Sequence, residues 1–476
     1  MNTLPTDCLY QIFQYFKDDL KTLHSCLLSN RTCCQLIIPI LWSNPWKLIQ
    51  KKESTPEYRN SLRSLISTLL SCLPSESKQF LHDKRIHWTS HTIFLNYITY
   101  CRTLDFHSIW DMLDVVSAQH PLFPFSNLKI HIKNIVGQEI CKMIILQSTK
   151  ITQMIISETS YSFFNLFQNL SLNDSQSLSH LNEFEYEINE NSNILNFYNI
   201  PNVCKNISNF TIHLKTTPSE SFIDLIKSQN SIKFMDITFD YYPSLKYVKS
   251  LLLHANTLTH LFVSCHHEKT FYNIFSAYHT FSNLRVLSYH FYNDYDNVYY
   301  EVDDDYNGIV KIVNVNLSLP NLEILELGGQ TTYSYHRTIA QIIQGTQGKL
   351  ERIYMNYRIY DTNLIINQSI LRSCQNLKFL TTHVTKDTLD IFNITDISWN
   401  FSTKNLELFL KRLEKEELVE KLNISLIYKQ IDLYLDKILE LFGTYYLKGV
   451  IASYFIEDEN DVLDEFNNWQ DPLFEY

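Results

Sequence analysis

One short apolar pattern recurs along most of the chain and limits the folds that it can adopt. In each copy, apolar residues stand at the first, fourth and sixth positions, as Leu322, Leu325 and Leu327 do in the clearest copy. Alternating apolar positions are typical of a short strand with one buried face. The main copies start 24 to 30 residues apart, except for one interval of 38, so each strand has room for a returning helix. The first positions of these copies are Cys101, Phe125, Ile151, Leu181, Ile207, Ile232, Leu258, Leu284, Leu322, Leu350 and Leu377, and weaker copies begin at Val419 and Leu447.

This period resembles that of leucine-rich repeats of the irregular kind. The resemblance covers residues 100–456 and implies an α/β solenoid, or horseshoe, in which stacked units share one core. Few units keep the Asn or Cys that the family carries after its strand, and Gln330 stands there in the clearest copy. The alternative is a set of unrelated βα units in a globular α/β domain.

The first forty-odd residues have a different pattern, which predicts three short helices. Leu9, Ile12, Phe13 and Phe16 follow helical spacing after a Pro5–Thr6 start. Asp18 and Asp19 can cap a second helix, and a third begins near Asn30 and meets a helix-breaking proline at Pro39. A module of this size buries little core alone, so some of its large apolar side chains are expected to be covered by another chain or by the rest of this one.

Residues 4–46 resemble an F-box, the module that docks onto a Skp-type adaptor in cullin–RING ubiquitin ligases. The match includes the Asn30–Arg31 step and Leu41, and it departs at Cys34, where many members carry Trp. An ordinary N-terminal helical cap is the alternative. The resemblance implies that adaptor binding or the core of the module falls to Leu4, Pro5, Leu9, Ile12, Phe13, Phe16, Leu20, Leu23 and Trp42, and the sequence does not divide these two roles.

These readings divide the chain into successive regions. The predicted fold class is α/β, with a small N-terminal three-helix F-box followed by an irregular leucine-rich-repeat solenoid. The regions are an F-box at 1–46, a helical linker at 47–99, a repeat array at 100–456 with an insertion at 291–308, and an acidic C-terminal tail at 457–476.

The insertion is rich in Tyr and Asp and is expected to form a loop. Tyr295, Tyr299 and Tyr300 are predicted to contact a target protein there, since tyrosines supply rigid contact area. Glu323 and Glu326 are further candidates, as outward positions on a strand. Part of the insertion is close to a calcium loop, but its twelfth position, Asn314, lacks the bidentate carboxylate that completes the coordination.

Composition excludes several classes of function. The net charge of -11 disfavours broad binding to nucleic acid, and no signal peptide or membrane span is found. The ten cysteines show no paired spacing, which favours reduced thiols and a cytoplasmic or nuclear location. No cofactor or metal site is predicted.

No catalytic motif stands out. Cys265, His266 and Glu268 are reactive types, but neighbouring residues on a strand point to opposite faces. We therefore expect a non-catalytic substrate-recognition subunit of a Skp–cullin–F-box ubiquitin ligase, whose F-box binds the adaptor and whose repeats bind a target protein for degradation. The alternatives are a leucine-rich-repeat scaffold outside any ligase, and an enzyme with an unrecognised site in the insertion or near Cys265.

Overall fold

The chain forms two compact units, residues 1–232 and 233–476. The computed structural model describes residues 4–49, 55–86, 88, 92–93, 95–117, 129–157, 176–188, 200–240, 245–266, 281–291, 319–329, 333–356, 364–377, 379–385, 411, 422–429, 435–448 and 451–458.

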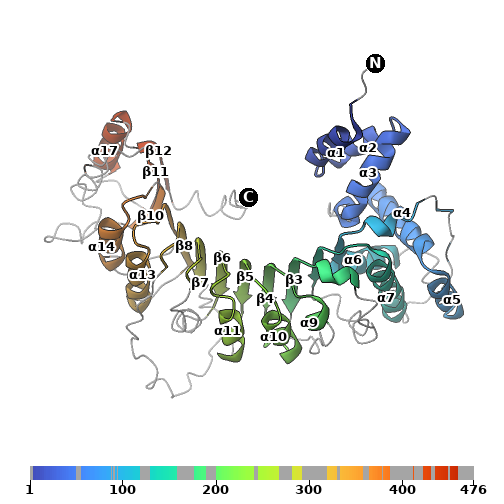
Figure 1. The fold of residues 1–476 in the computed structure, drawn as a ribbon. Coiled ribbons are helices and arrows are strands. Elements are labelled where there is room, and N and C mark those ends of the chain that lie inside the picture. Colours follow the sequence, from blue (N-terminus) through green and yellow to red (C-terminus); the bar gives the residue numbers. More distant parts are fainter. Residues whose placement is uncertain are drawn as a thin grey trace. The chain divides into compact units, whose positions relative to one another are not determined.

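The first unit opens with three helices, α1 (Thr6–Tyr15), α2 (Leu20–Leu27) and α3 (Arg31–Ser43), as the apolar spacing predicts (Figure 1). Asp19 caps α2, since its carboxylate accepts a hydrogen bond from the Thr22 amide at 3.1 Å. Asn30 caps α3 in the same way, with 2.8 Å from its Oδ1 to the amide nitrogen of Cys33. Pro39 lies inside α3, which continues past it to Ser43.

A small apolar core joins the three helices. Phe13, Leu23, Cys33, Ile37 and Ile40 are buried together, and partly buried side chains pack around them. These surrounding residues are Leu9, Cys26, Leu27, Leu36 and Leu41.

The end of α3 is fixed to the start of the sheet of this unit. Trp46, in the short helix η1 (Pro45–Ile49), is fully buried and donates its indole N–H to the Thr103 carbonyl at 2.8 Å. The Arg102 amide donates to the Ser43 carbonyl at 2.8 Å, and the ring of Trp42 stacks on Tyr97. The three-helix module is therefore held by packing and hydrogen bonds rather than by a free linker.

The sheet of the first unit has strands β1 (Thr103–Asp105), β2 (Gln153–Ile156), β3 (Glu183–Ile188) and β4 (Asn209–Leu214), all parallel and paired in chain order. β1 pairs directly with β2, so no strand lies between them in the sheet; Phe125, at which a repeat was predicted to start, lies outside the described residues. Two helices occupy this connection instead. The helical elements of this unit after η1 are α4 (Pro56–Cys72), α5 (Ser75–Asp83), η2 (Tyr97–Tyr100), α6 (Phe106–Ser117), α7 (Lys129–Gln147), η5 (Gln176–His180), α9 (Ile200–Val203) and α10 (Glu220–Lys227).

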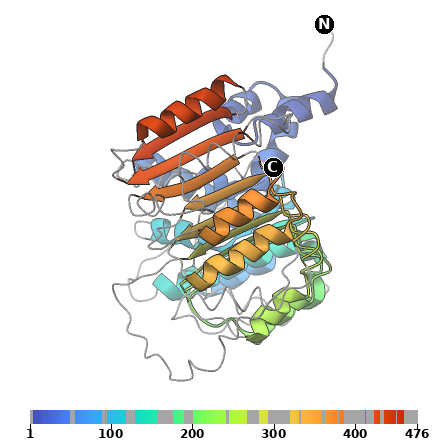
Figure 2. The same ribbon diagram turned by 90° about the vertical axis from the view of Figure 1, so that its left-hand side faces the viewer.

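The second unit continues with parallel strands in chain order and with helices on one side of them (Figure 2). Its strands are β5 (Phe234–Phe239), β6 (His260–Cys265), β7 (Val286–Phe291), β8 (Ile324–Gly329), β9 (Arg352–Asn356), β10 (Phe379–Thr385), β11 (Leu422–Lys429) and β12 (Ile451–Asp458). The helices among its described residues are α11 (Leu245–Leu252), α13 (Tyr333–Gly345), α14 (Leu364–Ser373) and α17 (Leu435–Leu447).

The two faces of the β5–β9 sheet differ in side-chain type. The face toward the helices is apolar, as Leu261, Leu287 and Leu325 illustrate in register on three neighbouring strands. We call the opposite face the outer face, and it carries Phe234, Asp236, Thr238, His260, Phe262, Ser264, Val286, Ser288, His290, Ile324, Glu326, Gly328, Arg352 and Tyr354.

Asparagines before the strands link each strand connection to the preceding one. The side-chain amides of Asn283 and Asn321 each donate to a carbonyl of the preceding connection at 2.6 Å, and that of Asn376 does so at 2.7 Å. These bonds satisfy backbone acceptors that would otherwise turn toward solvent at the loop edge.

The predicted architecture, a helical F-box followed by a leucine-rich-repeat horseshoe, is wrong. The structure is of the α/β class, with all-parallel strands and covering helices. The connections differ too much for a uniform repeat: the described residues between β1 and β2 include helices of 12 and 19 residues, whereas those between β3 and β4 include a helix of four. The period in the sequence predicted where strands occur, but it did not predict the structure of the connections between them.

We predict that Trp46 stabilises the junction between α3 and β1. Trp46→Ala should lower the free energy of unfolding by about 3–5 kcal/mol, because it leaves a cavity and removes the bond to Thr103. Trp46→Phe should cost about 1–2 kcal/mol, since most of the apolar contact remains. Urea unfolding of the full chain, followed by far-ultraviolet circular dichroism, measures both. Tyr15→Ala, at a side chain 90% exposed, is the control and should change stability by less than about 0.5 kcal/mol. Equal stability of Trp46→Ala and wild type would contradict this role.

Candidate protein-interaction surfaces

The structure divides the predicted adaptor-binding residues into core and surface. Phe13 and Leu23 are buried in the module core, and Leu9, Leu20 and Trp42 are partly buried. Leu4, Pro5, Ile12 and Phe16 are exposed, with 56% of Leu4, 41% of Ile12 and 38% of Phe16 accessible. The exposed set is large and apolar, which is unusual for a side of a small module that faces only water.

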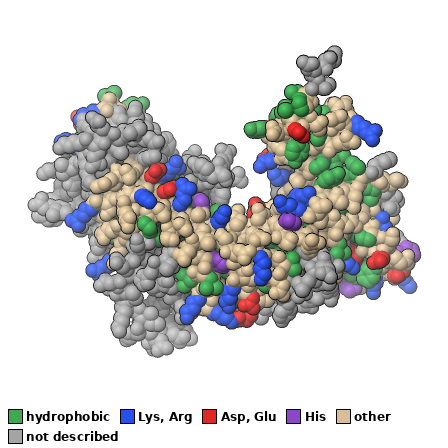
Figure 3. Space-filling view, viewed as in Figure 1, with side chains coloured by type: hydrophobic (Ala, Val, Ile, Leu, Met, Phe, Trp, Pro, Cys, Tyr) green, Lys and Arg blue, Asp and Glu red, His purple; other side chains and the backbone are tan. Residues whose placement is uncertain are grey.

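The sequence pattern missed one member of this exposed group. Tyr15 is 90% exposed and stands three residues after Ile12 and one before Phe16, so the three side chains share one side of α1. Together with Leu4, which precedes the helix, they form what we call the α1 surface. Figure 3 shows hydrophobic side chains grouped over the N-terminal helices. Tyr15 was missed because an aromatic residue beside an apolar stripe does not reveal from sequence whether it is buried.

Charged groups border the α1 surface. Lys47 forms an ion pair with Asp18, so that η1 is tied to the turn between α1 and α2. The hydrogen bond from Lys47 lowers the pKa of the Asp18 carboxyl. Burial opposes this effect, and the charges of Lys47 and Lys17 add smaller contributions that also lower the pKa. A shallow pocket next to this pair is lined by Gln14, Lys17, Leu20, Ile40, Leu41, Ser43, Asn44 and Lys47.

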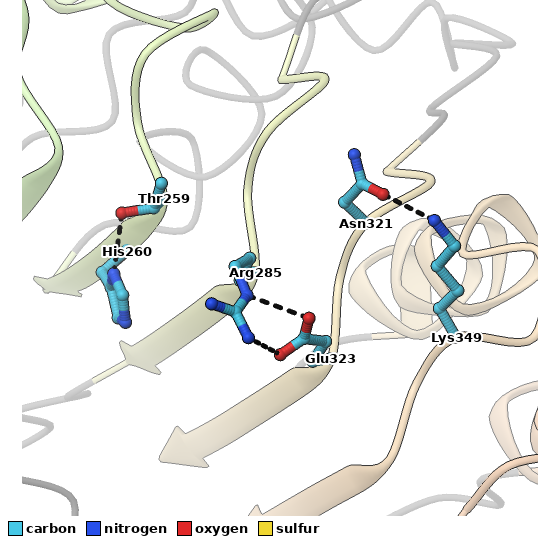
Figure 4. A network of polar contacts seen from close by, with 6 residues as sticks. All are labelled: Thr259, His260, Arg285, Asn321, Glu323 and Lys349. Atoms are coloured by element: carbon cyan, nitrogen blue, oxygen red, sulfur yellow. Dashed lines mark hydrogen bonds and ion pairs between the residues drawn. The ribbon is translucent and has the colours of Figure 1, made fainter. Parts of the chain in front are cut away.

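Glu323 was predicted to lie on the outer face of a strand, and this prediction is wrong. It precedes β8 and forms a bidentate ion pair with Arg285, at 2.9 Å to Nε and 2.7 Å to Nη2 (Figure 4). Lys349 and Asn321 make a further contact at this edge, 2.7 Å from Nζ to Oδ1. The carboxylate of Glu323 is therefore engaged within the loop edge, and its guanidinium partner is the more exposed of the two.

Glu326 does lie on the outer face, where two neighbours contact its carboxylate. His290 Nε2 lies 3.3 Å from Glu326 Oε1, and Ser288 also donates a hydrogen bond to this carboxylate. Burial by itself would raise the pKa of the Glu326 carboxyl, but the bond and charge of His290 and the bond from Ser288 outweigh it and hold the pKa below its ordinary value.

Gly328 is required beneath this pair. A Cβ atom at Gly328 would overlap the imidazole of His290, because the ring lies directly over the glycine backbone. The outer face thus holds a positioned histidine–carboxylate pair, which the spacing of Glu326 alone did not reveal.

The remaining predicted contacts are not all described. Tyr295, Tyr299 and Tyr300, the calcium-like segment around Asp303, and Glu268 lie outside the described residues. Cys265 is buried, with its Sγ 2.6 Å from the Tyr289 hydroxyl, whereas the next residue, His266, contacts Asp240 at 3.6 Å. The prediction that Cys265 and His266 do not converge on one atom is confirmed.

The described residues were compared with the requirements for metal binding, membrane spanning and reactive thiols. Within the described ranges, no group of three or more His, Cys, Asp or Glu side chains is placed to hold a metal ion. No helix in the same ranges combines the length and apolar character needed to cross a bilayer. Burial raises the pKa of the thiols of Cys101, Cys204 and Cys374 to about 12, so these thiols are protonated at neutral pH.

Comparison with known proteins gives no relative. No protein-family model matches the chain, and no curated protein matches it significantly. The α1 surface and the outer face are therefore interpreted from their own geometry.

We predict that Gly328→Ala acts through His290. The new methyl group should displace the imidazole and lower the free energy of unfolding by about 1–3 kcal/mol. In the double variant Gly328→Ala/His290→Ala the clash is absent. Its loss of unfolding free energy should therefore be smaller than the sum of the losses in the two single variants. Chemical unfolding of the four proteins measures the coupling. Additive effects would show that the ring and the glycine are independent.

We predict that Glu326 contributes to the acid sensitivity of the fold. A carboxyl with a lowered folded-state pKa stabilises the protein at pH values above its unfolded pKa, and the contribution is lost as pH falls through the folded value. Glu326→Gln should therefore flatten the loss of stability below about pH 4.5. Thermal melts of variant and wild type across pH test this, and parallel pH profiles would contradict it.

Proposed function

We propose that this protein is a substrate-recognition subunit of a Skp–cullin–F-box ubiquitin ligase, in which the three-helix module binds a Skp-type adaptor. The single observation that carries the proposal is the α1 surface, formed by Leu4, Ile12, Tyr15 and Phe16. Three of these residues are among those that the F-box resemblance assigns to the adaptor or to the core. In our proposal the exposed ones bind the adaptor, and the buried ones, Phe13 and Leu23, shape the module.

Burial energetics support a partner at this surface. The core of the module already has Phe13, Leu23 and Ile37 at its centre, so folding of the module does not use the exposed side of α1. Covering a large apolar side chain contributes roughly 1.5–3 kcal/mol. Four such side chains, on α1 and at its two ends, can therefore supply a useful part of the binding free energy of a stable complex, after the costs of association are subtracted.

The junction at Trp46 supports a positioning role. Trp46, Arg102 and the Trp42–Tyr97 stack fix α3 to the first strands of its unit. A ligase that works by effective concentration gains when the adaptor-bound module and the rest of its unit move together. The protein itself makes no bond in this proposal, and its contribution is to hold a target near the conjugating enzyme.

The sheet side chains outside the module would bind the target protein. We propose a cytoplasmic or nuclear location, which is supported by ten cysteines that form no disulfide bond and are mostly buried. The acidic net charge supports a protein partner rather than nucleic acid.

We predict that Ile12→Ala combined with Phe16→Ala reduces adaptor affinity at least tenfold, because two exposed anchors are truncated without loss of the buried core. A pull-down and a titration with a purified Skp-type adaptor measure this. The matched control is Phe80→Ala with Leu146→Ala, two side chains of the same unit that are each 41% exposed and lie on other helices.

The control should bind like wild type, and circular dichroism should show that both variants keep their helices. If wild type itself fails to bind any Skp-type adaptor, the ligase assignment is wrong and the protein is an interaction scaffold. If both variants lose binding equally, the α1 surface is not the docking site.

A further inference from the structure

A row of mainly apolar side chains crosses the outer face from β5 to β8. Phe234 pairs in register with His260, which pairs with Val286 on the next strand. Val286 in turn pairs with Ile324, so each of four neighbouring strands contributes one side chain to the row. Val286 is 8% exposed, and the other three side chains are partly exposed. Because the helices cover the opposite face, this row is not part of the core beneath them.

The row is uncharged along these four strands. The ring centroids of Phe234 and His260 lie 6.1 Å apart, so the imidazole extends the apolar surface of the phenyl ring. Burial, with a further contribution from the charge of Arg285, lowers the pKa of His260, and the imidazole is therefore neutral at pH 7. A stripe of this kind favours apolar side chains of a partner.

A single cation ends the row. Arg352 on β9 pairs in register with Ile324, so its side chain continues the same row on the outer face. The side chain is partly exposed, and its guanidinium makes no ion pair or hydrogen bond with any residue that the structure describes. A guanidinium offers a planar fork of N–H donors that matches a carboxylate. Arg352 is therefore placed to bind an anionic group beside an apolar surface.

Two carboxylates near the end of the row have other partners. Glu323 forms its bidentate ion pair with Arg285 at the loop edge (Figure 4). Glu326 follows Ile324 by two residues on β8, but its Oε1 lies 3.3 Å from His290 Nε2. Since these carboxylates are held elsewhere, an acid on Arg352 would have to come from a bound ligand.

We propose that the row from Phe234 to Arg352 binds an apolar segment of the target protein that carries one Asp or Glu side chain. Apolar side chains of the segment would cover Val286 and Ile324, and its carboxylate would accept hydrogen bonds from Arg352. Neighbouring strands lie about 4.8 Å apart, so the five strands span about 19 Å, the length of roughly six extended residues. This inference rests on the proposed function only for the identity of the ligand as a target.

Selection from a library of random linear peptides tests the site. The library is first depleted on the full-length Arg352→Gln protein and then selected on the full-length wild-type protein. Retained peptides should carry Asp or Glu at one position next to apolar residues. Fluorescence polarisation then gives the affinity of a selected peptide, and changing its acidic residue to the corresponding amide should weaken binding about tenfold.

Variants of the chain link this loss to the row. Arg352→Gln should weaken the acidic peptide about tenfold and should bind the acidic and amide peptides equally. Ile324→Ala should weaken both peptides several-fold, because it removes apolar contact but keeps the cation. The matched control is Arg372→Gln, at an exposed arginine of α14, which should bind like wild type.

Arg352→Lys is a second variant at the same position. It keeps the charge but loses the planar fork, so it should weaken the acidic peptide about threefold. Circular dichroism and thermal melting check that each variant is folded. No peptide after depletion, selected peptides without an acidic position, or an equal effect of the amide change on wild type and Arg352→Gln would each overturn the proposal.

Adaptor binding is measured on the same preparations. Loss of the acidic preference with intact adaptor binding would reject the Arg352 site and leave the proposed function standing. A retained acidic preference in a chain that binds no adaptor would reject the ligase assignment and leave the Arg352 site standing.

Discussion

Burial of alternate side chains along parallel strands is the constraint on which the rest of this structure depends. The apolar residue two positions before each of the strands β1 to β10 is fully or almost fully buried, as Leu284, Leu322 and Leu350 illustrate. A parallel strand needs a crossover connection, and that connection delivers the helix that covers it. Side chains on the opposite face of the strands do not pack in this core, so the outer face can carry residues that contact a partner.

The three-helix module also has one buried and one exposed side. Its core uses one side of α1 through Phe13 and leaves Ile12, Tyr15 and Phe16 on another. The caps at Asp19 and Asn30 set where α2 and α3 begin, so the apolar sides of these helices meet around Leu23. Trp46 then transmits the position of the module to β1 through a buried indole hydrogen bond. In the proposed function, the adaptor binds the α1 surface, and the target protein binds side chains of the sheet outside the three-helix module.

Strand positions were predictable from the sequence because a short alternating pattern has few other solutions. Strands follow nearly every predicted first position, and the three N-terminal helices follow their apolar spacing. The connections were not predictable: β1 pairs directly with β2, and α6 and α7 lie between these strands in the sequence, because one apolar triplet does not distinguish a strand from a turn of buried helix. Glu326 lies on the outer face as predicted, whereas Glu323 does not, and the partners of both carboxylates were missed for a similar reason. Glu323 is bound by Arg285 and Glu326 by His290, which lie 38 and 36 residues away in the chain, and no local pattern reports such pairs.

The central claim is that α1 binds a Skp-type adaptor. Hydrogen–deuterium exchange of the full-length protein, alone and with purified adaptor, tests it most directly. The account predicts slower exchange in peptides covering residues 4–16 on complex formation, and unchanged exchange in β5 to β9. A stable complex without protection in α1, or no complex at all, would contradict the claim.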